Sequence, residues 1–394
     1  MKNKLPFVIF VLLLTSFLLV GHLERPALSA ALVQAEEPAA DAALQAFVAD
    51  YEAFVRQQLE AEGVPGAAVA IIKDESLLLL RGYGVRSVSS TDSVDIHTVF
   101  RLASLSKGFT GILAGVLAEE GKLRWDEPVL DRLPGLRLHP EAQAERWQLR
   151  HLLSHATGLP RHTYSNLLNG GMAFKDILAR LPQVKPINPF GTSHDYQNVI
   201  FSLAGNMMEQ ATGQAFPDLL QTRLFNPLGM GDASATYDAM TATVNVALPH
   251  KWGKNGFLPE RLKPNYYEVI PAAGVNASIA DMAQWLNLLL GNRPDIAPPH
   301  LLDQAFEPAV EMLRNDRVLK YWASLESAHY AMGWRVLQLP GLRLIQHSGF
   351  VNGYRCEIAF SREEKIGIVV LANAPNAAVG HCIRAFFERY QLSV

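Results

Sequence analysis

The segment FRLASLSKGFTGILAGVLAEEGKL, residues 100–123, carries the pattern on which the expected fold depends. Ser104 and Lys107 lie three positions apart in it, surrounded by apolar and small residues. Residues three apart share one face of a helix, with Cβ atoms about 5–6 Å from each other. We therefore expect a helix that places a half-buried lysine beside a serine near its start and that stops at Gly121.

A lysine beside a serine can activate that serine. An ammonium group cannot accept a proton, but burial and nearby positive potential lower the pKa of a lysine, and the neutral amine can then act as a base for the hydroxyl. The start of a helix supplies positive potential and free backbone N–H groups. The S-x-x-K pattern alone occurs about once by chance in a chain of this size. A solvated lysine with a capping serine is therefore an open alternative on this motif alone.

The runs on either side of this segment predict further helices and strands. Before it, apolar residues recur at helical spacing over 44–59, and two apolar runs, 66–72 and 77–84, flank a polar turn as in a β-hairpin. Near the end of the chain, apolar runs indicate an antiparallel meander closed by a helix over 377–391. The meander strands are expected at 333–339, 342–349, 354–360 and 365–373.

The middle of the chain has a different sequence pattern. From about residue 121 to 324, short helical patterns alternate with turns rich in proline and glycine, and an amphipathic helix is expected at 281–291. We predict an α+β fold, with an antiparallel sheet flanked by helices and an inserted, mostly helical lobe. The sheet lobe would take residues of about 40–120 and 325–394, and the helical lobe about 121–324, with a catalytic cleft between the lobes.

The N-terminus differs in kind from the rest of the chain. A basic start, MKNK, is followed by an apolar run over 5–21 and then by small residues. This order is typical of a secretory signal peptide, with cleavage expected after Ala35 and a rival site at Ala27-Leu28-Ser29. We therefore expect residues 1–35 to direct the protein to the periplasm. An uncleaved inner-membrane anchor is the alternative, because the run approaches spanning length.

Composition excludes several classes of function. The chain of 394 residues has a net charge of −3 and no basic run, so we expect no nucleic-acid partner. Neither H-E-x-x-H nor G-x-S-x-G occurs. His151, His155 and His162 lie close in sequence without an evident carboxylate partner, so we expect no metal and no other cofactor.

The two cysteines leave their pairing open. Cys356 falls in a strand-like run and Cys382 in a helix-like one, so a disulfide and two free buried thiols are both possible.

Two further motifs support a catalytic role for the S-x-x-K motif. Tyr-Gln-Asn at 196–198 follows a glycine-containing turn in the helical region, and His-Ser-Gly at 347–349 ends a predicted strand. In this order the three motifs resemble those of the penicillin-recognising serine hydrolases. Segments such as EEGKLRWDEPVLDRLP and HSGFVNGYRCEIAF are similar to the class C β-lactamase branch, which also holds D-amino-acid peptidases, low-molecular-weight penicillin-binding proteins and esterases. The resemblance runs from about residue 44 to about residue 390.

The resemblance assigns a role to each motif residue. Ser104 would be the acylated nucleophile, and Lys107 would help to deprotonate it. Tyr196 would shuttle protons to the leaving nitrogen and from water. Asn198 would hold the Lys107 amine and the side-chain amide of the substrate. The backbone N–H groups of Ser104 and Phe350 would form an oxyanion hole, in which one donor is typically worth about 10²–10³ in rate.

The strand motif leaves the substrate open. His347, Ser348 and Gly349 would bind substrate, with Gly349 allowing it to lie against the strand edge. β-lactamases of this branch usually have lysine where this chain has His347, and a histidine with a pKa of about 6.5 is mostly neutral at pH 7. The resemblance implies an exported serine hydrolase, a monomer, with β-lactams as favoured substrates. A D-Ala-D-Ala-type carboxypeptidase or endopeptidase on peptidoglycan peptides, an esterase of small acyl esters and a penicillin sensor are the alternatives.

Overall fold

The computed structural model describes residues 42–313, 319–322 and 324–393. The predicted signal peptide, residues 1–35, lies outside the described residues. In the part of the chain that is described, no helix combines the length and the apolar character needed to cross a bilayer. Cys356 and Cys382 are both buried and both free, so the alternative of two unpaired thiols is the one the structure has.

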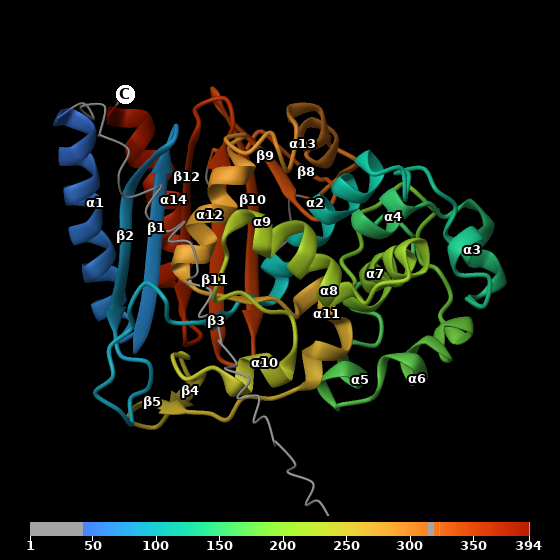
Figure 1. Ribbon diagram of the computed structural model, residues 1–394, viewed down its shortest axis with the longest axis horizontal. Coiled ribbons are helices and arrows are strands. Elements are labelled where there is room, and N and C mark those ends of the chain that lie inside the picture. Colours follow the sequence, from blue (N-terminus) through green and yellow to red (C-terminus); the bar gives the residue numbers. More distant parts are fainter. Residues whose placement is uncertain (1–41, 314–318, 323, 394) are drawn as a thin grey trace, which may run out of the picture. The chain divides into compact units, whose positions relative to one another are not determined.

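An eight-stranded antiparallel sheet forms the centre of the fold (Figure 1). Its strand order is β2-β1-β12-β11-β10-β9-β8-β7, so the hairpin near the start of the chain pairs with the last strand of the meander. This sheet confirms the predicted α+β class, and β7 and β8 extend it beyond the predicted strands. The strands are β1 (Gly66–Lys73), β2 (Ser76–Gly84), β7 (Val310–Glu311), β8 (Ser327–Tyr330), β9 (Arg335–Leu339), β10 (Leu342–Val351), β11 (Tyr354–Ser361) and β12 (Ile366–Ala372).

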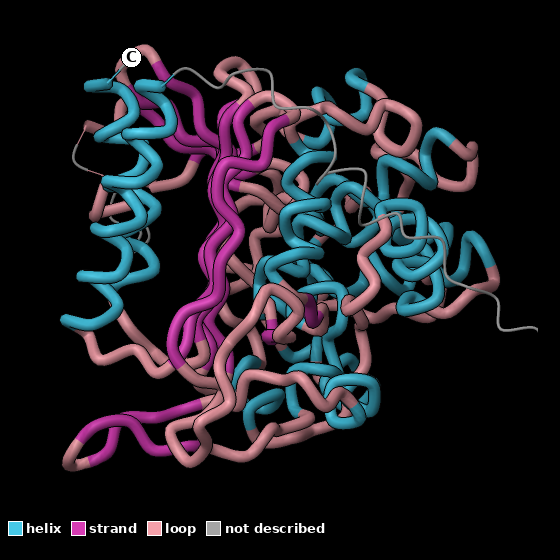
Figure 2. Tube along the Cα trace, turned by 60° about the vertical axis from the view of Figure 1, so that its left-hand side comes forward, coloured by secondary structure: helices cyan, strands magenta, loops and turns pink. Residues whose placement is uncertain are grey.

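Helices cover both faces of the sheet. The first and last helices, α1 (Ala42–Ala61) and α14 (Ala378–Ser393), lie side by side on one face, and α12 (Ile279–Leu289) lies on the other (Figures 1 and 2). Successive side chains of a strand point to opposite faces. Val69 of β1 therefore joins the core beneath α1 and α14, while its neighbour Ala70 joins the core on the α12 side. Because both faces of the sheet are covered, β1 and β12 are apolar along almost their whole length.

The position of α12 differs from the prediction. The predicted boundaries place this helix in the helical lobe, whereas it packs directly on β1 and β12. The apolar face of a sheet must be covered, and the order of segments along the chain does not show which helix covers it.

Most of the helical lobe packs around α7 (Asn198–Thr212), which contacts α2 (Ser106–Glu119), α4 (Leu149–Leu153) and α11 (Ile270–Ala273). Gly205 permits this packing, because a Cβ there would lie 2.3 Å from the Pro271 ring. The other helices are α3 (Val129–Arg132), α5 (Ser165–Asn169), α6 (Phe174–Leu178), α8 (Phe216–Leu220), α9 (Asn226–Leu228), α10 (Tyr237–Ala242) and α13 (Pro299–Ala305).

Two short strand pairs complete the structure. β3 (Phe100–Arg101) pairs with β6 (Asn276–Ala277), which holds the segment leading to Ser104 next to the end of α11. β4 (His250–Gly253) and β5 (Gly256–Pro259) form a separate hairpin that projects from the body in Figure 2.

Candidate active site

Ser104 lies in a single 3₁₀ turn, Ala103–Leu105, directly before α2. Ala103 has a φ of 50°, a left-handed conformation that is unfavourable for a residue with a Cβ and is often found at functional sites. Ser106 stabilises this turn, because its Oγ donates to the Ala103 carbonyl at 2.6 Å and accepts the Val275 N–H at 2.9 Å. The turn leaves Ser104 partly exposed while Ser106 is buried.

Lys107 is fully buried, not half-buried as expected from the sequence. Its Nζ lies 3.3 Å from Ser104 Oγ, 2.7 Å from Asn198 Oδ1 and 2.9 Å from the Ala272 carbonyl oxygen. Burial, followed by the positive charge of Arg335, holds the pKa of Lys107 well below its usual value. A neutral amine has two N–H groups and one lone pair. The two oxygens of Asn198 and Ala272 can accept both hydrogens, which leaves the lone pair for the hydroxyl of Ser104.

Tyr196 is the second titratable side chain next to Ser104. The two side chains share a hydrogen bond, and Lys107 Nζ is 4.6 Å from the centre of the Tyr196 ring. Desolvation raises the pKa of Tyr196 to about 12, although the charge of Arg335 acts in the opposite direction. Tyr196 is therefore a neutral phenol near pH 7, able to donate and accept a proton but not to act alone as a strong base.

His347 does not take the place predicted for it. The residue is fully buried, and both ring nitrogens are engaged: Nδ1 lies 2.9 Å from the Ser348 carbonyl oxygen and Nε2 lies 2.9 Å from the Tyr330 hydroxyl. A carbonyl can only accept, so Nδ1 carries the hydrogen and Tyr330 donates to Nε2. Burial, then Arg335 and Lys107, lower the pKa of His347 well below its usual value. His347 is thus a neutral support behind the pocket, where Ser348 rather than His347 lines the wall.

A close approach to the turn that carries Ser104 also requires Gly349, and its predicted role in letting substrate lie against the strand edge stays a prediction. A Cβ at this position would lie 2.3 Å from the Leu102 carbonyl oxygen and 3.1 Å from the Ala103 Cβ. The missing side chain therefore lets β10 approach the turn that carries Ser104. The ladder between β9 and β10 covers Leu342–Gln346, so the edge of β10 from His347 onward is left open on that side.

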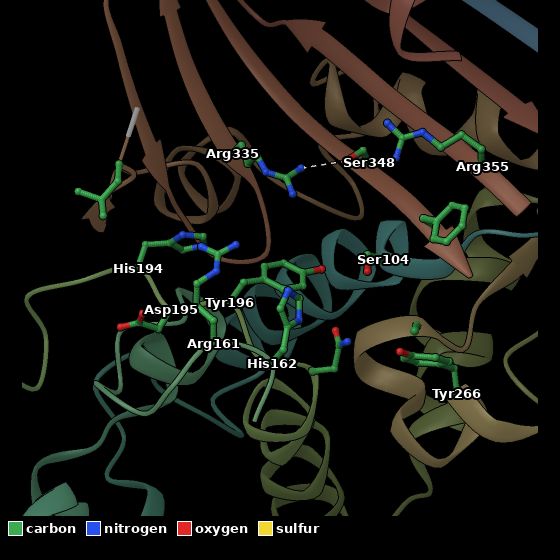
Figure 3. Close-up of a pocket in the computed structure, with 14 residues that line it drawn as sticks. Ser104, Arg161, His162, His194, Asp195, Tyr196, Tyr266, Arg335, Ser348 and Arg355 are labelled. Atoms are coloured by element: carbon green, nitrogen blue, oxygen red, sulfur yellow. Dashed lines mark hydrogen bonds between the residues drawn. The ribbon is translucent and has the colours of Figure 1, made fainter. Parts of the chain in front are cut away.

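The motif residues meet in a pocket of about 890 Å³ (Figure 3). Ser104, Tyr196, Asn198, Ser348 and Phe350 all line it. Phe350 is 60% exposed, and its backbone N–H as an oxyanion donor stays a prediction. Among the described residues, no three His, Cys, Asp or Glu side chains gather so that they could hold a metal ion.

Arg335 is a pocket residue that sequence reasoning missed. It lies on β9, is 4% exposed and also lines the pocket (Figure 3). Its Nη1 donates to Gln346 Oε1 at 3.1 Å and to Ser348 Oγ at 3.4 Å, while its Nε has no partner among the described residues. A buried, unpaired donor is costly unless a ligand satisfies it. The available signal is a charged residue inside a mostly apolar predicted strand, GWRVLQL.

Comparison with known proteins agrees with this geometry. The family model described as Beta-lactamase matches residues 51–392, and the chain therefore belongs to the beta-lactamase family. This is a family of serine hydrolases, and the chain has its penicillin-binding-like fold.

Several relatives carry more specific names. The unguisins hydrolase ungD' of Aspergillus campestris (strain IBT 28561) is 26% identical over 82% of this chain and 61% of its own length. Protein flp of Staphylococcus aureus (strain N315) is 25% identical over 81% of this chain and 61% of its own length. The D-aminopeptidase of Gluconobacter oxydans (strain 621H) is 27% identical over 80% of this chain and 57% of its own length. The chain thus spans about three fifths of the length of these relatives.

A solved structure shares the fold. The octameric penicillin-binding protein homologue from Pyrococcus abyssi superposes with a TM-score of 0.75 at 21% identity, covering 88% of this chain and 77% of that chain. At this level of identity the likeness concerns the fold alone. The expected monomer stays a prediction.

Proposed function

We propose that this protein hydrolyses an amide bond that has a carboxylate close to it on the leaving-group side, through an acyl-enzyme at Ser104. One observation carries the proposal: Arg335 is buried in the same pocket as Ser104 and has an unpaired Nε. A guanidinium can bind a carboxylate through two parallel N–H groups, and Arg335 Nη1 already reaches the Oγ of Ser348, which lines the same pocket. Arg335 therefore supplies the permanent positive charge that His347 lacks.

The reaction follows from the contacts around Ser104. The neutral Lys107 amine accepts the hydroxyl proton while Oγ bonds to the substrate carbonyl carbon. Tyr196 then gives its proton to the leaving nitrogen and recovers one from the Lys107 ammonium as the C–N bond breaks. In the second half, water attacks the acyl carbon, and its proton returns to Ser104 through Tyr196 and Lys107. The N–H groups of Ser104 and Phe350 would stabilise the oxyanion in both halves.

The substrate class follows from the position of the charge. A β-lactam and a D-Ala-D-Ala-type peptide both carry a carboxylate next to the amide that is cleaved, and we propose that the pocket accepts this shared chemistry. The names of the D-aminopeptidase and penicillin-binding relatives support peptide-like substrates. An exported enzyme would meet such substrates outside the cytoplasm, in keeping with the predicted signal peptide.

Time-resolved mass spectrometry of the intact protein tests this proposal. The protein is mixed with penicillins, cephalosporins, carbapenems and a peptide ending in D-Ala-D-Ala, with the Ser104→Ala variant as control. A transient adduct on Ser104 with release of product supports hydrolysis, and a lasting adduct indicates a peptidase or a sensor. If no compound forms an adduct while p-nitrophenyl esters are turned over, the enzyme is an esterase and the proposal is wrong. An adduct on Ser104→Ala would place the nucleophile elsewhere.

A further inference from the structure

A second arginine approaches Ser348 from the strand opposite Arg335. Arg335 lies on β9 and Arg355 on β11, the two neighbours of β10, and both line the pocket. Figure 3 shows both side chains extending toward Ser348 from opposite sides. The proposed reaction uses Arg335 but gives Arg355 no task.

A buried chain of hydrogen bonds joins the two arginines beneath the pocket. Arg335 donates to Gln346 Oε1, the Gln346 amide donates to Glu357 Oε1 at 2.8 Å, and Arg355 Nη2 donates to Glu357 Oε2 at 3.2 Å. Gln346 is 0% and Glu357 3% exposed. Both carboxylate oxygens of Glu357 are thus engaged below the surface, while the Arg355 side chain is 27% exposed. The acidic partner lies inside and the cation faces the pocket.

A third arginine adds to the charge at this point. Gly380 of α14 marks where the three side chains meet. A Cβ built on Gly380 would lie 3.2 Å from Arg384 Nη1, 3.4 Å from Glu357 Oε2 and 3.6 Å from Arg355 Nη2. Arg384 therefore lies near the ion pair of Arg355 and Glu357, and the three side chains together carry a net positive charge. Asp195 also lines the pocket, but it accepts hydrogen bonds from Ser193 and Asn188.

The cluster lies on the acyl side of the scissile bond. Tyr196, which protonates the leaving group in the proposed reaction, has Arg335 and Arg161 as its cationic neighbours. Arg355 is instead paired across the sheet with Phe350, whose N–H is the proposed oxyanion donor. The leaving group therefore extends toward Arg335, and the acyl group extends past Phe350 toward Arg355.

We propose that Arg355, supported by Arg384, binds an anionic group on the acyl part of the substrate. The enzyme would then select substrates with an acidic acyl group, such as a peptide with a side-chain carboxylate before the cleaved bond. This inference rests on the proposed function, because the two sides of the pocket are defined by the reaction at Ser104.

Matched ester pairs test the proposal without requiring the natural substrate. The probes are the mono-p-nitrophenyl esters of adipic and suberic acid, each compared with the uncharged hexanoate or octanoate ester of equal chain length. The readout is the ratio of kcat/KM for the anionic over the neutral ester, since a general loss of activity cancels in this ratio. We expect a ratio above one for the wild type. Charge-assisted hydrogen bonds contribute about 1.5–3 kcal/mol, so Arg355→Gln should lower the ratio by about 10–150-fold, through KM.

Further variants separate charge recognition from damage to the fold. Arg384→Gln should lower the ratio less, and Arg355→Lys should retain much of it because the charge is kept. Arg56→Gln, on the exposed part of α1, is the matched control and should leave the ratio unchanged. A wild-type ratio of one or less, or an unchanged ratio in both glutamine variants, overturns the inference. Full turnover of both esters by Ser104→Ala would instead overturn the proposed function, so the two failures are distinguishable.

Discussion

Lys107 shows how burial prepares a base. Removing an ammonium from water disfavours its charged form, and the nearby guanidinium of Arg335 disfavours it further, so the pKa of Lys107 is well below its usual value. In the pH range between this lowered pKa and the ordinary lysine value, the unfolded chain binds the proton and the folded chain does not. Lys107 therefore makes stability fall as the pH drops from the ordinary lysine pKa to the lowered one, and below the lowered pKa its contribution no longer changes. The protein thus gives up stability for a reactive amine.

The pH dependence of acylation tests the role of Arg335 in this arrangement. Acylation requires neutral Lys107, so kcat/KM should rise with pH on the acid side of the profile. In Arg335→Gln the repelling charge is gone, the pKa of Lys107 rises, and this limb should move to higher pH. The measurement uses an uncharged p-nitrophenyl ester, which makes no carboxylate contact. Arg343→Gln, also in the sheet and bonded to the Phe306 carbonyl, should leave the profile in place. A limb that moves to lower pH in Arg335→Gln would contradict this account.

The same arginine should also determine affinity for a carboxylate. With a substrate that carries a carboxylate beside the cleaved bond, Arg335→Gln should lower kcat/KM by about 10–150-fold, corresponding to about 1.5–3 kcal/mol for a charge-assisted hydrogen bond. Arg335→Lys keeps the charge but not the planar pair of donors, so it should restore the pH profile more fully than the affinity. Steady-state kinetics on both variants checks this. Equal affinity in wild type and Arg335→Gln would mean that the carboxylate binds elsewhere.

These residues also show what spacing can and cannot predict. Ser104 and Lys107 were accessible because helix geometry is local, and three positions in sequence translate directly into proximity. The sequence marks Arg335 only as a charged residue within a strand, because alternation along a strand gives the face a residue takes but not which strand lies beside it. His347 was read as a substrate contact from its motif. Its partner Tyr330, which occupies Nε2 and turns the imidazole into a support, lies on a strand that was not predicted.

The contact between β10 and the 3₁₀ turn is the part of the framework on which the site depends. Because Gly349 has no Cβ, the strand can approach Leu102 and hold Ser104 next to the proposed oxyanion donor at Phe350. The long apolar runs of β1, β10, β11 and β12 were predictable from their patterns. The two-residue strand β7 and the four-residue β8 contain too few positions for a period of two to be recognised.

Gly349→Ala is expected to separate the strand from the turn. The new Cβ would meet the Leu102 carbonyl oxygen at 2.3 Å, so β10 or the turn must shift. One misplaced oxyanion donor costs about 10²–10³ in rate, and we expect a loss of that order in the rate of acylation of Ser104. Stopped-flow acylation with a chromogenic substrate measures this. Gly135→Ala is the control, because a Cβ at Gly135 meets no atom within 4 Å. Acylation at the wild-type rate by Gly349→Ala would show that the close approach is dispensable.

Separate hydrophobic cores lie on the two sides of the sheet. Ser104 and Lys107 belong to the α12 side, together with α2 and α7, whereas α1 and α14 seal the opposite face with aromatic residues. Tyr51 of α1 donates its hydroxyl to the Cys382 carbonyl of α14 at 2.7 Å, and its ring packs edge-on against Phe386 at 5.0 Å. Periodicity predicted both helices. Their pairing joins the two ends of the described chain, and such distant contacts leave no local pattern in a single sequence.

Phe386→Ala should therefore weaken the fold without changing the reaction. Phe386 is fully buried, and removing a buried phenylalanine costs about 3–5 kcal/mol through lost contacts and the cavity left behind. Urea unfolding should show this loss, while kcat/KM, normalised to the fraction of protein that a covalent inhibitor labels at Ser104, should match the wild type. Leu392→Ala, at a side chain that is 89% exposed on the same helix, should change neither quantity. A fall in normalised activity for Phe386→Ala would show that packing on the α14 face is transmitted through the sheet to β10, because the two faces share the backbone of β10 and β11.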